Sequence, residues 1–567
     1  MHESFAIAFA TLLLSALTLH AATEPVIQWS AGDKPREFRR AADVIVLDAA
    51  TKLHGADGAT LEAWVLPRRM GEQVFVARGL PEIGPGGERF HRPAEGWLNF
   101  FIGTDARGFL MGCINGNSRM PFPLVTIERL APGQWHQIVV VKQPDGFQRF
   151  HHNGALIHTD TEAEAAGKAW PFRDEEPGEP VRLSVPLGGA LGEVAVWACA
   201  LSSDEIRANW DAKSARYIPH SAPQPISLRP MDEHPGAQPL APDAASWPRE
   251  RERVLAEWKK LLGPMPEVAP ALDVQTLDET DCGSYVRRKV SIQVQPNDRM
   301  PCWLLVPKTL PSNRRAPAII CFYGTTNGAG KDTTVGLSGA KPGSPPQRNR
   351  AFALDMVGAG FVALAPDFLR DGERLPLSGR PYDTQDFYER FPDWSCVGKD
   401  CWDVQRAVDF LETLPFVQSD RIGMVGHSYG GHTTIFAAGL EPRIRAVFAN
   451  GPVSDFVLHG AHWAVPKGGG ASQSLPSLRP FLLEHRAPPV SFAEVTALMA
   501  PRSLWVNQAA GEWRPNEEEN AAAVMGLYRT LGAPDRVRYM WCAGDHDFPP
   551  AVRAAAVEWF RKWLNSQ

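Results

Sequence analysis

The sequence has little of what a nucleic-acid-binding or membrane protein needs. Its 567 residues carry 58 basic and 64 acidic side chains, a net charge of −6, and no run of Lys or Arg. Binding to nucleic acid or to an anionic membrane surface would need such a basic patch, so neither is an expected partner. Beyond residues 4–19, no stretch is long and apolar enough to cross a bilayer. We therefore expect a globular protein without stable membrane insertion.

Cysteine is also scarce, with eight residues in the chain. Cys199, Cys302 and Cys321 lie in apolar, strand-like runs, where cysteine behaves as a small buried hydrophobe. No spacing resembles a zinc site, and no cluster suggests Ca²⁺ ligands, so we expect no metal and no cofactor. Cys396 and Cys401 lie five positions apart and could form a disulfide in an oxidising compartment; sequence leaves both states open.

The one long apolar stretch lies at the N-terminus. Residues 4–19 contain no charged side chain, their centre is Leu12-Leu13-Leu14, and Ala21 and Ala22 follow. An apolar segment of this length before small residues is typical of a cleaved signal peptide, although Lys and Arg are missing from its start. We expect residues 1–22 to be a signal peptide and the mature protein to be secreted or periplasmic.

Two patterns divide the rest of the chain, whose length fits two or three domains. Residues 25–215 hold short strand candidates between turn signals, which predicts an all-β sandwich; they lie at 61–66, 97–102, 137–141 and 191–197. Residues 216–246 contain seven prolines and predict an extended linker. Residues 247–567 begin with a helix at 248–262 and continue with strands alternating with helices, which predicts a mostly parallel α/β sheet. Its eight strand candidates are 285–294, 302–306, 318–322, 361–365, 422–425, 446–449, 503–507 and 537–541.

A nucleophile motif follows the fifth of these strands. Gly426-His427-Ser428-Tyr429-Gly430 comes directly after an apolar run and before a predicted helix. A Gly-x-Ser-x-Gly turn between strand and helix is typical of a nucleophile elbow, whose glycines allow the two elements to pass closely. Ser428 is therefore the candidate nucleophile. His546 follows it by 118 residues, between the last strand and the last helix, where the general base of an α/β hydrolase is expected.

The acid that orients His546 has several candidates. Glu512 follows the seventh strand, the usual position, and is our first choice. Asp455, after the sixth strand, is the alternative, and Glu517 is a further one. The sequence leaves all three open.

The oxyanion hole is expected to combine two backbone N–H groups. One belongs to Tyr429, next after the nucleophile, and the other to Thr325, in the loop after the third strand. The polar side chains Asp403, Arg406 and residues 371–374 are expected to tie helix and loop ends together rather than to touch substrate.

Both parts of the chain also resemble known families. The first part resembles laminin-G-like, concanavalin-type jelly rolls at Thr60–Val65, Gly133–Val140, His152–Ile157 and Leu191–Ser202. That resemblance implies a binding module, often for glycans or proteins. Over about residues 248–567, the second part resembles dienelactone-hydrolase-like and acetyl-xylan-esterase-like α/β hydrolases, at the elbow and at Leu261–Pro264, Pro301–Pro307, Ala365–Asp367 and Asp403–Leu411. This resemblance implies cofactor-independent hydrolysis of carboxylic esters.

We interpret the chain as an exported serine hydrolase with an N-terminal binding module. Its expected substrates are acyl or related esters on carbohydrate, including polysaccharide-linked esters. A serine peptidase of the prolyl-oligopeptidase type shares the core, but such enzymes usually carry a propeller larger than the N-terminal part. A third hypothesis is a non-catalytic glycan-binding protein with a decayed hydrolase domain; the intact elbow and His546 argue against it.

Overall fold

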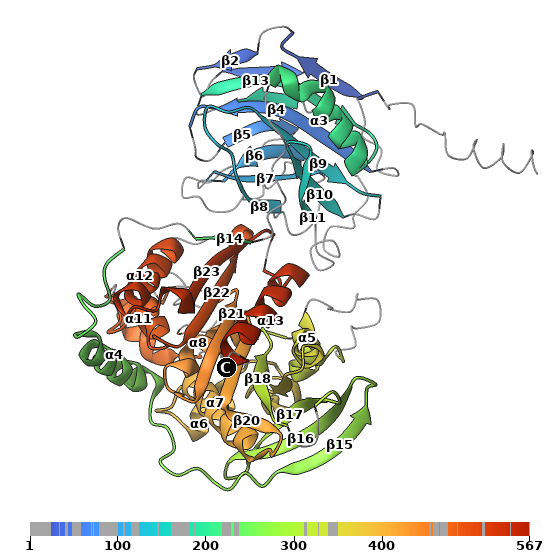
Figure 1. The fold of residues 1–567 in the computed structure, drawn as a ribbon. Coiled ribbons are helices and arrows are strands. Elements are labelled where there is room, and N and C mark those ends of the chain that lie inside the picture. The colour runs from blue at the N-terminus through green and yellow to red at the C-terminus, as the bar shows by residue number, and fades with distance from the viewer. Residues whose placement is uncertain are drawn as a thin grey trace, which may run out of the picture. The chain divides into compact units, whose positions relative to one another are not determined.

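The chain folds into two compact units, the first formed mostly by residues before 226 and the second mostly by residues from 226 onward (Figure 1). The computed structural model describes residues 24–32, 35–39, 43–47, 58–69, 71, 73–78, 100–105, 108–114, 124–144, 147–159, 181–185, 188–217, 228–231, 237–310, 314–326, 328–337, 350–452, 455–456, 464, 474–484, 486–512, 516–544 and 546–565. The expected signal peptide, residues 1–22, lies outside these ranges. In the helices that are described, no segment combines the length and the apolar character needed to span a membrane.

The first unit is built of two antiparallel sheets, as the strand pattern predicts. One sheet has the order β1-β13-β4-β9-β10-β11, with β2 also paired to β13, and the other has the order β3-β12-β5-β6-β7-β8. The strands are β1 (Ile27–Ser30), β2 (Arg36–Phe38), β3 (Val44–Leu47), β4 (Ala59–Pro67), β5 (Gln73–Arg78), β6 (Phe100–Thr104), β7 (Phe109–Ile114), β8 (Leu124–Arg129), β9 (His136–Lys142), β10 (Gln148–His152), β11 (Ala155–Thr159), β12 (Val181–Ser184) and β13 (Gly189–Trp197). Residues 97–99 of one expected strand lie outside the described ranges.

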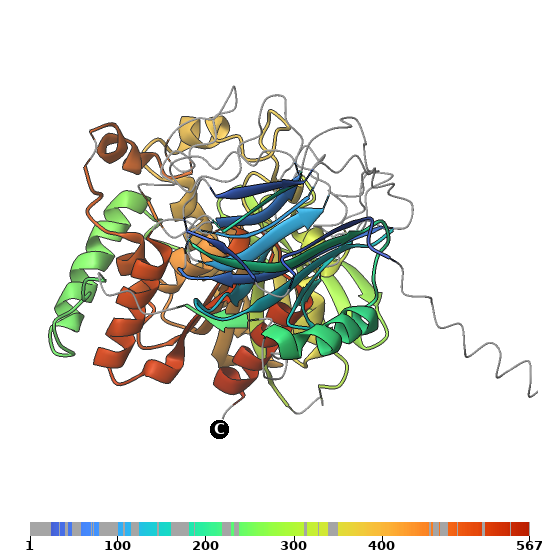
Figure 2. The ribbon, with the colours of Figure 1, turned by 90° about the horizontal axis from the view of Figure 1, so that it is seen from above.

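One face of the first sheet is covered by α3 (Ser203–Tyr217), seen in green beside the strands in Figure 2. The central strands β4 and β9 are therefore buried along nearly their whole length. Trp64 of β4 stacks on Trp210 of α3 with ring centroids 5.5 Å apart, and on Tyr217 at 4.5 Å. Helix α3 ends at Tyr217, two residues into the segment predicted as a linker.

The second unit contains one ten-stranded sheet in the order β14-β23-β22-β21-β20-β18-β19-β17-β16-β15. All eight strands predicted for it are present, and β14 and β15 are added at the two edges. Pairings from β19 through β18, β20, β21 and β22 to β23 are parallel, whereas the outer pairings are antiparallel. The strands are β14 (Leu228–Pro230), β15 (Gln275–Asp281), β16 (Tyr285–Gln295), β17 (Asp298–Pro307), β18 (Ala316–Phe322), β19 (Val362–Pro366), β20 (Val417–His427), β21 (Ile444–Asn450), β22 (Ser503–Ala509) and β23 (Val537–Cys542).

Helices cover both faces of this sheet. Helices α5 and α13 pack on one face, where Phe560 and Leu564 leave no room for a side chain on Gly423 of β20. Helices α7, α8 and α12 pack on the other face, with α4 and α11 beside them (Figure 1). The helices and turns are α4 (Trp247–Leu262), η1 (Gly330–Val335), α5 (Phe352–Gly358), η3 (Gly372–Arg374), α6 (Gln385–Arg390), α7 (Cys396–Thr413), α8 (Tyr429–Ala438), η4 (Pro476–Leu478), α10 (Arg479–Leu483), α11 (Phe492–Ala497), η5 (Ala510–Glu512), α12 (Glu517–Thr530), η6 (Pro534–Arg536) and α13 (Pro550–Leu564).

The structure corrects the predicted linker and answers the question that the sequence left open about Cys396 and Cys401. The segment predicted as an extended linker contributes β14, whose Leu228 pairs with Cys542 of β23, so part of it belongs to the hydrolase sheet. Cys396 and Cys401 are both free thiols, buried near the start of α7. The proline content of the linker did not exclude a three-residue edge strand, since an edge strand needs hydrogen bonds on one side only.

Candidate active site

Ser428 occupies a sharp turn between β20 and α8. Its φ is +56°, a backbone conformation that non-glycine residues rarely adopt. A Cβ on Gly426 would lie 2.1 Å from the carbonyl oxygen of Gly430, and one on Gly324 would lie 2.8 Å from Cβ of Ser428. The expectation that the elbow glycines allow a close approach is therefore confirmed. Gly324, after β18, serves the same purpose on the other side of the serine.

The structure brings Ser428 and His546 together. His546 lies in the loop between β23 and α13, and its Nε2 is 2.6 Å from Oγ of Ser428. When Nε2 is unprotonated, the hydroxyl donates to it, which is the contact a general base needs to accept the serine proton. Both side chains are half-buried, so they are shielded on one side and remain accessible on the other.

A buried amide network holds the His546 loop against the elbow. Nδ2 of Asn450, at the end of β21, lies 2.7 Å from Nδ1 of His427 and donates to the carbonyl oxygen of Asp547 at 2.8 Å. Nδ2 of Asn507, at the end of β22, donates to Oδ1 of Asn450 at 2.7 Å. Burial lowers the pKa of His427 well below its ordinary value, so its ring stays neutral and accepts from Asn450. The carboxyl ends of three strands therefore fix the backbone beside His546.

Arg350 holds the same loop from the other side. Its guanidinium donates to the carbonyl oxygen of His546 at 2.8 Å and pairs with the carboxylate of Asp547 at 3.3 Å. The ring of His427 lies 4.7 Å from the ring of His546 between centroids. These contacts restrict the imidazole to one position over Ser428.

The acid candidates lie on neighbouring loops. Glu512 ends η5, directly after β22, and the N–H of the preceding Gly511 donates to the carbonyl oxygen of Gly544 in the His546 loop at 2.9 Å. The side chain of Glu512 lies outside the described part of the structure. Asp455 is half-buried in the loop after β21 and accepts from Asn516 at 3.4 Å.

The Nδ1 edge of His546 faces the start of the Asp455 loop. A Cβ built on Gly451 would lie 3.1 Å from Nδ1 of His546. Glu517, the third candidate, is buried at the first turn of α12. The loops that carry Glu512 and Asp455 therefore each contact the His546 loop, through Gly511 and Gly451.

The loop after β18 presents one N–H group toward solvent. Thr325 is exposed, and its N–H donates to no acceptor among the described residues. The neighbouring N–H groups are taken, that of Thr326 by the hydroxyl of Tyr382 at 3.1 Å and that of Gly328 by Asp371 at 3.0 Å. Tyr429 is the first residue of α8, and N–H groups in the first turn of a helix have no intrahelical acceptor. Both expected oxyanion donors are thus on elements that adjoin Ser428.

The polar clusters near these loops have two roles. Arg374 donates to Asp403 of α7 at 2.7 Å and to Asp298 at 2.9 Å, and Arg406 of α7 donates to the carbonyl oxygen of Pro270 at 2.6 Å, so the prediction that they tie elements together is confirmed. Asp371 has a second role, because it accepts from the N–H of Gly328 and so holds the loop after β18 that carries Thr325.

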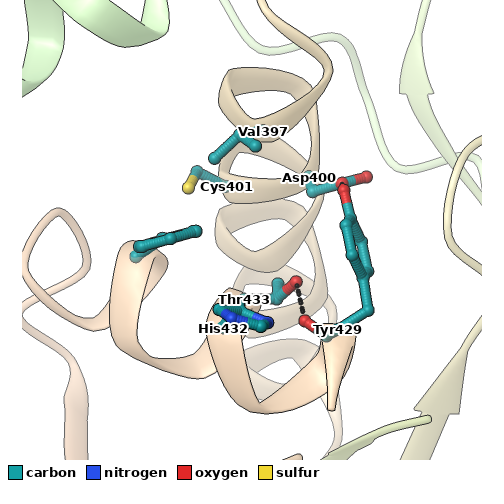
Figure 3. A pocket seen from close by; sticks show the side chains of 7 residues that line it. Val397, Asp400, Cys401, Tyr429, His432 and Thr433 are labelled. Carbon is teal, nitrogen blue, oxygen red and sulfur yellow. Dashed lines mark hydrogen bonds between the residues drawn. The ribbon is translucent and has the colours of Figure 1, made fainter. Parts of the chain in front are cut away.

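Sequence reasoning missed Arg370, Tyr382 and Asp400. Arg370 is buried and donates to the hydroxyl of Tyr429 at 2.9 Å, and that hydroxyl donates to Asp400 at 2.6 Å. Figure 3 shows Tyr429 reaching from the start of α8 to Asp400 on α7. Burial raises the pKa of Asp400 to about 6, and the charge of Arg370 opposes this shift. No motif marks these residues, since they are far apart in sequence and carry no characteristic spacing.

Comparison with known proteins agrees with both folds. Residues 241–544 match the Abhydrolase family, and residues 40–207 match the concanavalin A-like lectin/glucanases superfamily. The predicted α/β-hydrolase and jelly-roll domains are therefore confirmed. The curated Bacillus subtilis (strain 168) protein named "Putative hydrolase YtaP" is 25% identical over 322 residues, which cover 54% of this chain and 97% of that protein.

Solved structures similar to this chain include two esterases. A glucuronoyl esterase from Solibacter usitatus aligns with a TM-score of 0.45 and 21% identity, over 59% of this chain and 97% of that one. A structure named "putative acetyl xylan esterase", from Bacteroides fragilis NCTC 9343, aligns with a TM-score of 0.43 and 19% identity. The alignment covers 54% of this chain and 78% of that one.

Proposed function

The chain belongs to the Abhydrolase family, and from this premise we propose that it is a serine-dependent carboxylic ester hydrolase. The observation that carries the proposal is the 2.6 Å contact between Oγ of Ser428 and Nε2 of His546. The strained φ of Ser428 adds support, because such strain persists where the surrounding structure enforces it and clusters at functional sites.

The proposed mechanism uses the groups around that contact. Oγ of Ser428 attacks the ester carbonyl carbon while Nε2 of His546 takes the hydroxyl proton. The N–H groups of Tyr429 and Thr325 stabilise the negative oxygen that forms. The alcohol leaves with the proton held by His546, and a water molecule then hydrolyses the acyl-enzyme by the same route in reverse. Glu512, or alternatively Asp455, holds Nδ1–H of the imidazole.

A fluorophosphonate probe tests the proposal directly. It should react with Ser428 in the folded protein and block turnover of p-nitrophenyl acetate, because only an activated serine attacks such a probe. Mass spectrometry of the labelled protein should place the adduct on the peptide that contains Ser428. A protein that neither reacts with the probe nor hydrolyses any ester would instead be the binding protein with a decayed hydrolase domain.

A substrate panel distinguishes the reaction classes. We expect turnover of acetyl, feruloyl or methyl-glucuronoyl esters and none of a dipeptide amide. Hydrolysis of the amide with no ester preference would favour the serine-peptidase alternative.

We extend the proposal to esters carried by carbohydrate, acted on outside the cytoplasm. The concanavalin-type first unit supports this, since that fold is shared with lectins and glucanases, and so does the signal-peptide-like segment at residues 1–22. On this proposal, the first unit binds a polysaccharide and raises the local concentration of its esters around the second unit.

Removal of the first unit tests this division of labour. A protein that begins at Ile226 keeps β14 within the hydrolase sheet, which a start near Ala244 would remove. It should retain kcat on a small soluble ester and lose activity on an insoluble, esterified polymer. Equal loss on both substrates would mean that the first unit only supports the fold of the second.

The isolated residues 25–215 should be retained on xylan, pectin or chitin; no retention on any of them would remove the targeting proposal.

A further inference from the structure

Backbone strain gathers beside Ser428. Among the described residues, positive φ outside Gly, Asn and Asp occurs at Ser428 (56°), Arg370 (80°) and Tyr382 (64°). Asn and Asp tolerate this conformation, whereas bulky side chains reach it only when their surroundings enforce it. Arg370 and Tyr382 come from the loops between β19 and α6. Both contact the elements that carry the two proposed oxyanion donors.

The guanidinium of Arg370 forms a hydrogen bond with the residue that carries one proposed donor. It is 2% exposed and donates to the hydroxyl of Tyr429 at 2.9 Å and to Oδ2 of Asp400 at 3.3 Å. The same Oδ2 accepts the hydroxyl hydrogen of Tyr429 at 2.6 Å. A buried ion pair thereby holds the far end of the phenol, and the backbone N–H of the same residue is the first proposed oxyanion donor.

The main chain of Arg370 is connected, through hydrogen bonds of Tyr382, to the segment that carries the other proposed donor. Its carbonyl oxygen accepts from the N–H of Tyr382 at 2.8 Å. The hydroxyl of Tyr382 then accepts from the N–H of Thr326 at 3.1 Å and donates to Asp371 at 2.8 Å. Asp371 also accepts from the hydroxyl of Thr326. These bonds hold Thr326, the residue next to the proposed donor Thr325.

We propose that Arg370 is the positioning residue that fixes both oxyanion donors at once, its guanidinium through Tyr429 and its main chain through Tyr382. The inference rests on the proposed function, because it assigns Tyr429 and Thr325 as the donors. Arg370 does not touch the substrate.

The physical reason is pre-organisation. Donors stabilise an oxyanion most when they are already aimed at it and need not reorganise during the reaction. A buried arginine is costly to desolvate, and its cost is offset here by an equally buried carboxylate. A residue that joins both donor segments sets the distance between the two N–H groups, which neither segment could set alone.

The decisive variant is Arg370→Gly. Glycine accepts a φ of +80° without strain, so the variant keeps the backbone conformation and removes the whole side chain, guanidinium included. We expect kcat on p-nitrophenyl acetate to fall about 10- to 100-fold, within the range seen when oxyanion stabilisation is weakened, and KM to change by less than about threefold. Added guanidinium ion should partly restore kcat by entering the vacated space.

A matched control is Arg374→Ala. Arg374 is also buried, lies four positions on in the same loop, and pairs with Asp298 and Asp403 away from the donors. Its loss should lower the melting temperature as much as the loss of Arg370. At a temperature well below both transitions, it should leave kcat within about threefold of the unchanged protein, since losing a buried pair acts on stability.

Tyr429→Phe keeps the test valid if Arg370→Gly does not fold. It removes only the hydroxyl that joins Tyr429 to Arg370 and Asp400. We expect a smaller loss of kcat than for Arg370→Gly. The double variant should lose less than the two single losses combined, because the two residues share one contact. Tyr528→Phe, which removes another buried hydroxyl bonded to the carbonyl oxygen of Arg502, serves as its control.

A boronic acid separates positioning from stability. Its tetrahedral adduct with Ser428 places an oxygen in the oxyanion hole, so its affinity should fall by the same factor as kcat in Arg370→Gly. Binding of an intact ester to the Ser428→Ala protein should be unaffected by the added Arg370→Gly change. Equal boronate affinity in Arg370→Gly and Arg374→Ala would overturn the inference.

The outcome is separable from that of the proposed function. If the unchanged protein reacts with a fluorophosphonate and turns over esters, the proposed function stands whatever Arg370 does. Full kcat and boronate affinity in both Arg370→Gly and Tyr429→Phe would then reject Arg370 alone. A lack of fluorophosphonate reaction in the unchanged protein would reject both.

Discussion

Ester turnover should disappear when Ser428 is replaced with Ala. The variant removes the oxygen that attacks the carbonyl carbon and leaves His546 without its hydrogen-bond partner at 2.6 Å. The expected loss in kcat is roughly 10⁴- to 10⁶-fold, since removal of a triad nucleophile costs nearly the whole of triad catalysis. Initial rates on p-nitrophenyl acetate, with enzyme concentration taken from absorbance, give the measurement.

The fold must survive for that result to count. Ser428 holds a φ of +56°, so alanine at this position keeps the strain and loses only the hydroxyl. The melting temperature should therefore shift by no more than a few degrees. Ser284→Ala, in the exposed turn of the β15–β16 hairpin, is the control and should be fully active. Activity retained in Ser428→Ala would refute the nucleophile assignment and with it the proposed mechanism.

The second large effect concerns the carboxylate behind His546. Glu512→Gln should lower kcat by about 10²- to 10⁴-fold, because an amide neither fixes the imidazole tautomer nor stabilises the imidazolium. KM should change little, since the carboxylate acts on the imidazole and not on the substrate. The steady-state parameters on one short acyl ester provide the comparison.

Asp455→Asn and Glu517→Gln form the matched arms of that experiment. Each removes one charge without changing size, so any general effect of charge appears in all three variants. A severe loss in Asp455→Asn with a mild one in Glu512→Gln would move the acid to the loop after β21. That result would fit the close approach between Gly451 and Nδ1 of His546.

Much of the fold could be read from local patterns. The eight strands predicted for the second unit, the helix α4, and the helices α8 and α13 that follow the elbow and His546 fall where the sequence patterns predict them. Their signals are local, because each needs only a few neighbouring residues to define an apolar face. The edge strands β14 and β15 were missed, since β14 has three residues, two of them polar or proline, and β15 is exposed along almost its whole length.

The candidate site also combines residues that local sequence signals predict with residues that only the fold brings together. The sequence alone predicted Ser428, His546, the loop that carries Thr325 and the helix start that carries Tyr429, because the elbow motif and its order along the chain are local and sequential features. Tertiary structure alone placed Arg370, Tyr382 and Asp400 beside them. Those residues come from separate loops and a helix, and they meet only because β18, β19 and β20 are neighbours in the sheet. The burial of Arg370 and Asp400 and the positive φ of Arg370 and Tyr382 are properties of the folded chain, created by packing that no spacing in the sequence encodes.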